Sequence, residues 1–381
     1  MHIKKAIFNH FRNLNTTLSL GPHFNVFTGS NGQGKTNILE GIHVAAYGRS
    51  FRAGRLVDLV QFDKESARVE LQVDNKGVST PVSVQLSKGS RTHTVGGAEN
   101  ASLAEVGERL RVIFFGPDDL RLVKGSPRLR RDFLDRAITI HYLPYARLLK
   151  GYQRLLRQRN LLLRDFQGRP NPPVTLMETY EEQLARHAAQ IIRFRLKYLR
   201  EFIPKACDLV QQHTDSHLTL SIAYAASGSL QPDESTASDA LQKLLTALYR
   251  KTRAQDACGS TTSVGPHLDD LELTLNGKNA RYFASQGEQR QLAVAFKLAQ
   301  LSLWKERFGV KPVLLLDDVT SELDSRRTGL LFSLVSRWQV QTLISTTSPP
   351  DVLLEAEDCR FFDVREGVVQ RRPKGDNQKG V

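Results

Sequence analysis

The most constraining feature of this chain is the segment from residue 29 to residue 36, which reads Gly-Ser-Asn-Gly-Gln-Gly-Lys-Thr. It matches the phosphate-binding pattern G-x-x-x-x-G-K-[ST]. Glycines let backbone N–H groups turn towards a polyphosphate where a Cβ would collide. A strand-like run at residues 23–27 precedes the segment and a helix-like run at 37–46 follows it, so the helix would begin at the anion. We therefore predict a phosphate site formed by Gly29, Ser30, Asn31, Gly32, Gln33, Gly34, Lys35 and Thr36.

Composition limits the class of protein. A chain of 381 residues can form a large core and two or three lobes. Its three cysteines lie far apart, which favours a reducing cytosol over a disulfide framework or a zinc site. No apolar run approaches the ~20 residues that span a bilayer, and no signal peptide is evident, so we expect a cytoplasmic protein with no membrane partner. The net charge of +13 favours a polyanionic partner, although charge alone does not identify it.

Hydrophobic periodicity divides the chain into four parts. Residues 1–117 contain the phosphate loop and an antiparallel sheet, residues 118–238 are mainly helical, and residues 239–372 return to mixed α/β structure. Residues 373–381 form a polar tail that we expect to be disordered. The predicted fold class is an α/β nucleotide-binding head with an antiparallel β subregion and an inserted, projecting helical lobe.

Two carboxylates follow the apolar run at residues 313–316. A carboxylate at the end of a central parallel strand, beside the phosphate loop, can hold Mg²⁺. We assign this role to Asp317, with Thr36 as the second metal-holding residue, and we assign orientation of the attacking water to Asp318. The alternative is that both residues only end a strand and start a turn.

The segment Ser285-Gln286-Gly287-Glu288-Gln289 opens a predicted helix and has two interpretations. Ser285 with Glu288 forms the pattern of a capping box. A serine hydroxyl, a glycine N–H and a helix N-terminus also favour the γ-phosphate of a nucleotide bound to a second molecule. Both interpretations can hold together.

The order of these motifs, followed by Ser321-Glu322-Leu323-Asp324, resembles the ABC-type ATPase head of transporters and SMC proteins. The segments at residues 117–127, 130–135 and 264–267 extend the resemblance to the RecF family of bacterial recombination and gap-repair proteins. The resemblance implies a Mg²⁺-dependent ATPase head that dimerises around two ATP molecules. Because Asp318 is one methylene shorter than the Glu usual at this position, we expect slow hydrolysis that serves as a switch. It also implies binding to double-stranded and gapped DNA, and cooperation with RecR, RecO and the recombinase RecA in repair of single-strand gaps and stalled replication forks.

The resemblance also implies roles for individual residues. It gives ATP binding to residues 29–36, the metal to Thr36 and Asp317, and catalysis to Asp318. The signature contacted by the second subunit would comprise Ser285, Gly287, Glu288 and Gln289, and the D-loop would include Ser321 and Asp324. Asp318 stands where ABC heads usually have Glu, and Leu268 stands where the family often has Arg. Gln61 is the candidate for the metal-contacting glutamine of ABC heads.

Positive charge is concentrated between residues 121 and 164, where twelve Lys and Arg residues face two Asp residues. This cluster of positive charge could simply form a solvated helix face, but we favour the alternative that it contacts DNA phosphates. No base-reading motif is evident, so binding would follow the DNA backbone and shape. The candidate DNA-binding residues are Arg128, Arg130, Arg131, Arg147, Lys150, Arg154 and Arg157. Two rival functions are the ATPase subunit of a transporter and an SMC-like scaffold with a structural nucleotide.

Overall fold

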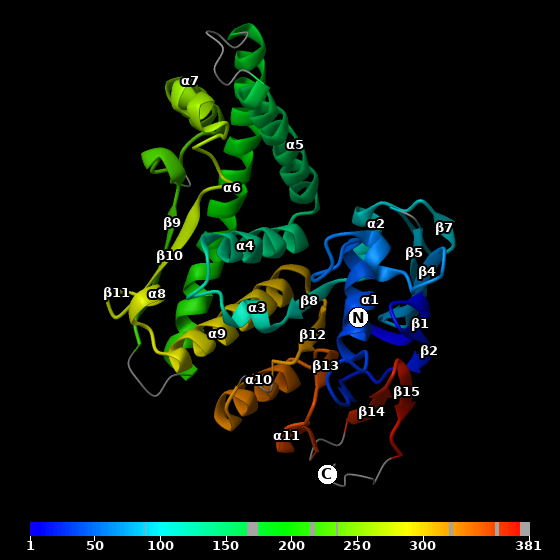
Figure 1. Cartoon of the computed structure of the whole chain (residues 1–381). Helices are drawn as coiled ribbons and strands as arrows, with labels where there is room; N and C mark the ends of the chain where they lie inside the picture. The colour runs from blue at the N-terminus through cyan, green and yellow to red at the C-terminus, as the bar shows by residue number, and fades with distance from the viewer. Residues whose placement is uncertain are drawn as a thin grey trace. The chain divides into compact units, whose positions relative to one another are not determined.

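The computed structural model describes residues 1–87, 89–165, 174–213, 218–233, 235–319, 323–354 and 358–373 (Figure 1). The chain forms two compact units: unit 1 comprises Met1–Asp119 with Leu301–Val381, and unit 2 comprises Leu120–Gln300. Residues 239–300, which we expected to group with the C-terminal part of the head, belong to unit 2. The expected disordered tail lies outside the described residues, except for Pro373. Within the described residues, no helix is long and apolar enough to cross a bilayer.

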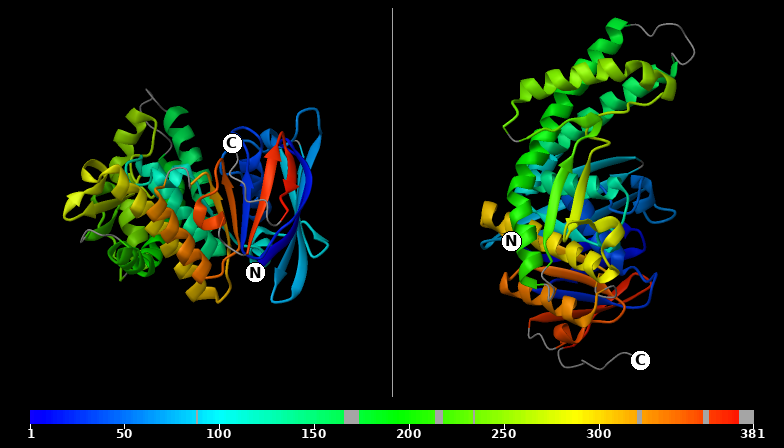
Figure 2. Two further views of the ribbon diagram at one scale, coloured as in Figure 1. Left: turned by 90° about the horizontal axis from the view of Figure 1, so that it is seen from below. Right: turned by 90° about the vertical axis from the view of Figure 1, so that its left-hand side faces the viewer.

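Unit 1 contains a six-stranded sheet in the order β15-β14-β3-β13-β12-β8. All neighbouring strands are parallel except β14 and β15, which form an antiparallel hairpin. Every residue of the central strands β3, β12 and β13 is buried, as expected for parallel strands covered on both faces. Figure 2 shows the C-terminal strands beside the N-terminal ones. The strands are β3 (Phe24–Thr28), β8 (Val112–Phe115), β12 (Val313–Asp317), β13 (Thr342–Thr346), β14 (Cys359–Arg365) and β15 (Val368–Arg371).

A second six-stranded sheet of unit 1 is antiparallel, in the order β2-β1-β4-β5-β6-β7. It confirms the antiparallel region predicted from the alternating pattern at residues 67–94. Its strands are β1 (His2–Phe11), β2 (Leu14–Ser19), β4 (Ser66–Asn75), β5 (Val78–Ser87), β6 (Ser90–Val95) and β7 (Ala98–Glu99).

Helix α1 (Lys35–Tyr47) contacts strands of both sheets and joins them into one core. A Cβ at Gly41 would lie 2.5 Å from the Phe8 ring, so a glycine lets the helix approach the antiparallel sheet closely. The other side of the parallel sheet packs on α10, where the Phe24 and Phe332 rings meet edge to face. The remaining helices of unit 1 are η1 (Leu56–Leu59), α2 (Leu103–Arg109), α10 (Ser325–Arg337) and α11 (Asp351–Leu354).

Unit 2 is built on long helices, with α6 packed against both α5 and α7. A small antiparallel sheet in the order β11-β10-β9 completes it. Pairing of β10 with β9, and packing of α7 on α6, explain why residues 239–300 belong to this unit. Its elements are α4 (Pro127–His141), α5 (Leu143–Asp165), α6 (Val174–His213), β9 (Leu220–Ala225), η2 (Ser227–Ser229), α7 (Ser238–Gly259), β10 (Asp270–Leu275), β11 (Lys278–Asn279) and α8 (Ala280–Phe283). Helices α3 (Pro117–Leu120) and α9 (Gln286–Phe308) extend across the boundaries between the units.

Candidate nucleotide-binding site

The predicted phosphate loop connects β3 to the first turn of α1. Gly29, Gly32 and Gly34 all have positive φ angles, of 153°, 80° and 112°, which side chains rarely adopt. A Cβ at Gly29 would lie 2.3 Å from the carbonyl oxygen of Val364, so steric contact also requires glycine there. The loop therefore has the curled backbone that a phosphate cradle needs.

Lys35 is a buried residue at the start of α1. Its Nζ donates to the carbonyl oxygens of Gly29 and Ser30, at 2.6 and 2.8 Å, so the ammonium group is held inside the loop. Burial lowers the pKa of Lys35, while the carboxylates of Asp318 and Asp317 oppose that shift. A phosphate oxygen is a stronger acceptor than a carbonyl and would take over these hydrogen bonds.

The metal-binding pair predicted from the sequence meets in the structure. Thr36 Oγ1 donates to Asp317 Oδ1 at 2.7 Å, and Ser345 Oγ donates to the same oxygen at 2.5 Å. Thr36 lies in the first turn of α1, Asp317 ends β12 and Ser345 lies on the intervening strand β13. Mg²⁺ favours a few protein oxygens together with phosphate oxygens and water, and these oxygens fit that preference.

Asp318 has a backbone φ of +50°, in the left-handed region that is uncommon for residues other than glycine. Its N–H donates to the Ser345 carbonyl oxygen at 3.0 Å, which fixes this turn at the end of the strand. Strained backbone of this kind is concentrated at functional sites. The conformation gives the two consecutive carboxylates, Asp317 and Asp318, different surroundings, as their different predicted roles require.

The structure adds residues that the motif did not predict. Asn13, in the turn between β1 and β2, donates through Nδ2 to the Gln33 carbonyl oxygen at 3.3 Å and accepts from Asn37 Nδ2 at 2.8 Å. On the other side, the N–H of Gly367 donates to the same Gln33 oxygen at 2.9 Å, and the N–H of Glu366 donates to Gln33 Oε1 at 2.7 Å. Two turns distant in sequence therefore hold the loop at Gln33.

Other predicted residues have different surroundings. Gln61 Oε1 lies 3.2 Å from His10 Nδ1, so the side-chain contact found for Gln61 is to β1 and its metal role remains a prediction. Asp324 accepts from the N–H of Arg327 at 2.9 Å and caps α10. Ser321 lies outside the described residues. Leu268 is exposed. Its neighbour His267 is half-buried, and its Nδ1 lies 2.7 Å from the Tyr152 hydroxyl of α5.

The signature segment forms the predicted capping box. The N–H of Ser285 donates to Glu288 Oε2 at 2.7 Å, and the N–H of Glu288 lies 3.3 Å from Ser285 Oγ. Gln289 Nε2 donates to the Ala284 carbonyl oxygen at 2.7 Å, which ties the signature to the preceding turn. Ser285 is exposed at the start of α9, and Gly287 and Glu288 are half-buried. This geometry is compatible with a phosphate contact from another molecule.

The basic residues of unit 2 divide into two groups. Arg147, Lys150, Arg154 and Arg157 are all exposed on α5, and we call them the basic face. Arg130, by contrast, is 3% exposed and donates two bonds of 2.7 Å to the Asp270 carboxylate. It also donates to three backbone carbonyls, so we withdraw it from the candidate DNA contacts.

Two further candidates lie on α4 with Arg130. Arg131 is half-buried and donates to the Asp269 carbonyl oxygen at 2.8 Å, whereas Arg128 is exposed. Of the two, only Arg128 is exposed, and its Nε lies 3.8 Å from Asp132 Oδ2 one turn further along α4.

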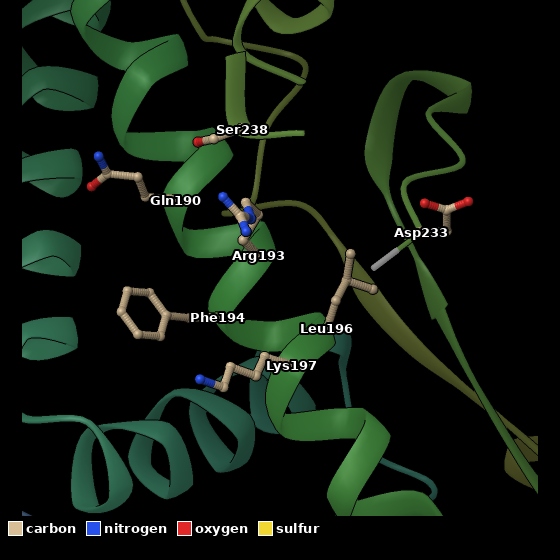
Figure 3. Close-up of a pocket in the computed structure, with 7 residues that line it drawn as sticks. All are labelled: Gln190, Arg193, Phe194, Leu196, Lys197, Asp233 and Ser238. Atoms are coloured by element: carbon tan, nitrogen blue, oxygen red, sulfur yellow. The ribbon is translucent and has the colours of Figure 1, made fainter. Parts of the chain in front are cut away.

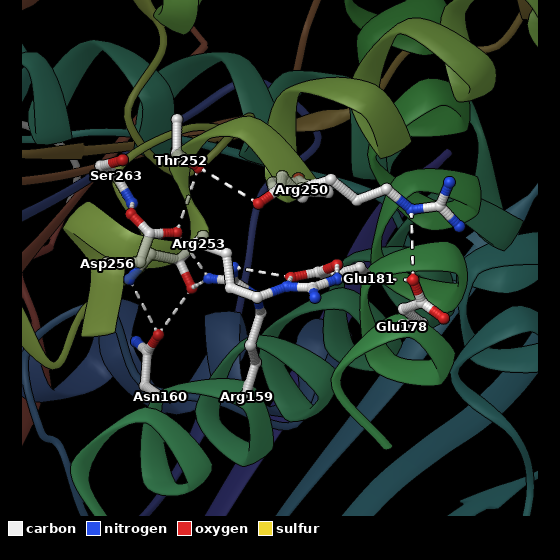
Figure 4. Close-up of polar contacts among 11 residues, drawn as sticks. Arg159, Asn160, Glu178, Glu181, Arg250, Thr252, Arg253, Asp256 and Ser263 are labelled. Atoms are coloured by element: carbon white, nitrogen blue, oxygen red, sulfur yellow. Dashed lines mark hydrogen bonds and ion pairs between the residues drawn. The ribbon is translucent and has the colours of Figure 1, made fainter. Parts of the chain in front are cut away.

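Arg159, counted in the charge excess, is fully buried in a network that joins three helices (Figure 4). It pairs with Asp256 of α7 at 2.7 Å and with Glu181 of α6 at 3.1 Å. Arg253 contacts the other oxygen of Glu181 at 2.6 Å. Buried charges require such partners, so Arg159 holds the helices together and adds nothing to the external positive surface.

Sequence analysis also missed a second basic surface. Arg186, Arg193, Lys197 and Arg200 recur along α6 at helical spacing and are all exposed. A pocket of about 280 Å³ lies beside two of them (Figure 3). It is lined by Gln190, Arg193, Phe194, Leu196, Lys197, Asp233 and Ser238. The helical spacing of these cations is visible in the sequence, in a segment with lower net charge than residues 121–164.

The phosphate loop, the Asp317 strand end and the two sheets define an ATPase head of the ABC/SMC type. In agreement, the chain superposes on the SMC head domain of Pyrococcus furiosus with a TM-score of 0.55 at 15% identity, over 97% of this chain and 96% of that one. A family model described as the RecF/RecN/SMC N terminal domain matches residues 2–369. These findings confirm the predicted fold class.

Relatives of higher sequence identity show which family of ATPase heads the chain belongs to. The chain is 34% identical to the DNA replication and repair protein RecF of Oceanobacillus iheyensis, over 97% of this chain and 100% of that protein. It is 35% identical to the RecF protein of Pediococcus pentosaceus, over 97% and 99%. A solved structure of the recombination mediator protein RecF-ATPrS in the RecFOR pathway superposes with a TM-score of 0.88 at 30% identity, over 98% of both chains. The chain belongs to the RecF family, as its motifs predicted.

Proposed function

We propose that this chain is an ATP-gated DNA clamp that acts in recombinational repair of single-strand gaps and stalled replication forks. Two copies bind two ATP molecules, each between the phosphate loop of one copy and the signature of the other. The closed dimer holds DNA, and slow hydrolysis of ATP reopens it.

The observation that supports this proposal most strongly is the contact between Thr36 and Asp317. It joins the phosphate loop after β3 to the end of β12, with Lys35 inside the loop, and these are the groups that would hold Mg²⁺ and the phosphates of ATP. When bound, Mg²⁺ would neutralise developing charge on the phosphates. Relatives described as RecF-ATP and RecF-ATPrS superpose over nearly the whole chain, which supports ATP as the nucleotide.

Asp318 is the candidate that orients the attacking water. Its carboxylate is one methylene shorter than the Glu usual in ABC heads, so it reaches the water less well. Because general-base catalysis depends on hydrogen-bond reach, we infer a slow ATPase suited to a switch.

The DNA assignment rests on charge and family. The four cations of the basic face are exposed and lie on one side of α5, and Arg128 is exposed on α4 of the same unit. Such a surface binds the phosphate backbone of duplex or gapped DNA without reading bases. The solved relative is described as belonging to the RecFOR pathway, which supports RecR and RecO as partners. Cooperation with the recombinase RecA is proposed from the family resemblance.

The decisive experiment replaces Ser285 by Arg and measures molecular mass with and without ATP and gapped DNA. We expect Ser285→Arg to bind ATP as a monomer but to lose ATP-dependent dimerisation, because the larger side chain fills the space of the γ-phosphate. Leu268→Arg, an exposed position in the same unit, is the control and should dimerise normally. An ATP-dependent dimer of Ser285→Arg would contradict the shared site.

The two rival functions predict other results. A transporter subunit would show no binding to gapped DNA. A scaffold with structural nucleotide would retain ATP without turnover. A DNA-binding titration on the same protein tests the first alternative, and a phosphate-release assay tests the second.

A further inference from the structure

Three aromatic side chains are conspicuous on the surface. Among the described residues, the large aromatic side chains in the exposed class are Phe62, Tyr282 and Phe283, which are 89%, 72% and 69% exposed. Single exposed apolar residues are common and need no explanation. Two of these three, Tyr282 and Phe283, directly precede the signature, and Phe62 follows Gln61, the candidate metal-contacting glutamine.

The aromatic pair before the signature is held in place. Asn279 Oδ1 accepts from the N–H of Arg281 at 3.0 Å, and the N–H of Ala284 donates to the Ala280 carbonyl oxygen at 3.1 Å. Ala280 is fully buried and anchors this turn, α8. Tyr282 and Phe283 therefore present two rings on a fixed backbone.

The chain length limits how far these rings are from the signature. Consecutive Cα atoms are 3.8 Å apart, so the Cα of Phe283 lies within about 8 Å of that of Ser285, and the Cα of Tyr282 within about 11 Å. If Ser285 contacts the γ-phosphate held by a second copy, the backbone of both aromatic residues lies within about 11 Å of the Ser285 backbone, which is within reach of that copy's surface for large side chains.

Two exposed apolar side chains of unit 1 follow residues that are hydrogen-bonded to the phosphate loop or to β1. Val368 is 59% exposed and follows Gly367, whose N–H donates to Gln33 of the loop. Phe62 follows Gln61, whose N–H donates to the His10 carbonyl oxygen at 2.8 Å, on the strand that leads to Asn13. Val368 thus follows a turn that is bonded to the loop itself, and Phe62 follows a residue that is bonded to β1, three positions before Asn13.

We propose that Tyr282 and Phe283 of one copy pack, in the ATP-bound dimer, against the exposed side chains of Phe62 and Val368 of the second copy. This inference rests on the proposed function, because it requires Ser285 of one copy to contact the ATP bound to the other copy. Two-fold symmetry makes the contact twice per dimer. Burial of these rings contributes favourable hydrophobic free energy to an interface that is otherwise formed through the phosphates of ATP. The rings become exposed again when the two copies separate.

The first test is the double variant Tyr282→Ser with Phe283→Ser. With saturating ATP, we expect its dimer dissociation constant, measured by sedimentation equilibrium, to rise at least about tenfold. ATP affinity of the dilute monomer should stay within about twofold, because the phosphate loop is unchanged. The matched control is Leu244→Ser, which removes an apolar side chain that is 53% exposed on α7 of the same unit, and it should dimerise like the parent chain.

The second test locates the contact. A photoreactive benzophenone amino acid in place of Phe283 should form ATP-dependent crosslinks between copies, at peptides that contain Phe62 or Val368. Crosslinks elsewhere on the second copy, or only within one copy, would overturn the inference.

Failures of the two proposals are distinguishable. A parent chain that stays monomeric with ATP overturns the proposed function and this inference with it. A parent chain that dimerises, while the double serine variant dimerises equally well, overturns this inference alone. Normal dimerisation with loss of binding to gapped DNA would assign the two rings to stacking on bases instead.

Discussion

The two halves of the proposed ATP site differ in how complete they are within one chain. In unit 1, Lys35 is buried in the phosphate loop and Thr36 already contacts Asp317, so the phosphate and metal groups are positioned by their own neighbours. In unit 2, exposed Ser285 is bonded to Glu288 of its own helix cap. From this difference we predict that unit 1 alone suffices for nucleotide binding, whereas the proposed closure and turnover need a second copy.

The largest expected effect concerns turnover, which depends on the complete site. Asp318→Asn keeps the size of the side chain but removes its charge, so ATP hydrolysis should fall by about 10²–10⁴-fold while ATP affinity changes little. The ATP-bound dimer on DNA should live longer. Phosphate release and a nucleotide-binding titration measure the two quantities. Hydrolysis at the parent rate would mean that another residue positions the water.

Asp317→Asn is the comparator for that experiment. Because Asp317 Oδ1 accepts from both Thr36 and Ser345, loss of its charge should impair Mg²⁺-dependent ATP binding or dimerisation rather than turnover alone. Identical behaviour of the two variants would remove the distinction between the metal and water roles.

The next largest expected effect concerns ATP binding by the phosphate loop of unit 1. Lys35→Ala should weaken ATP binding by about 30-fold or more, since loss of one member of a buried charge contact costs at least about 2 kcal/mol. Lys5→Ala, which removes an exposed ammonium group from β1, is the control and should bind normally. ATP binding measured by isothermal titration decides the result, with circular dichroism to verify folding.

A smaller effect concerns the basic face of unit 2. Replacing Arg154 and Arg157 with Glu should reduce affinity for gapped DNA about tenfold and flatten its salt dependence, since fewer counterions are released. The matched control replaces Lys243 and Lys251, two exposed cations on α7, with Glu. Affinity measured at several salt concentrations gives the slope. An equal change in both double variants would indicate a general charge effect and no specific face.

The smallest expected effect separates the two roles of Ser285. Ser285→Ala removes the helix cap and should lower the free energy of unfolding by about 1 kcal/mol. Ser285→Asn, which retains a capping side chain, should be nearly as stable as the parent chain in urea unfolding. Reduced ATP-dependent dimerisation in both variants would then report the phosphate contact, because only one of them loses the cap.

The arginines show where prediction from the sequence failed. Arg130 and Arg159 were counted as external charge, yet their partners Asp270 and Asp256 are distant in sequence and no local pattern pairs them. One signal was available: Leu155, Arg159 and Leu163 recur every four residues and share the buried face of α5. The exposed positions of the basic face follow the same periodicity on the other side.

The sequence alone determined the phosphate loop, the strand that ends in Asp317 and the helix that begins after Ser285. These are local features, set by glycine conformation, apolar runs and capping residues within a few positions. Only the tertiary structure decided which distant groups complete them: Ser345 on Asp317, and Asn13 and Gly367 on Gln33. The physical reason is that hydrogen bonds between separate strands and turns depend on sheet order, and here a parallel sheet brings residues from both ends of the chain to one loop.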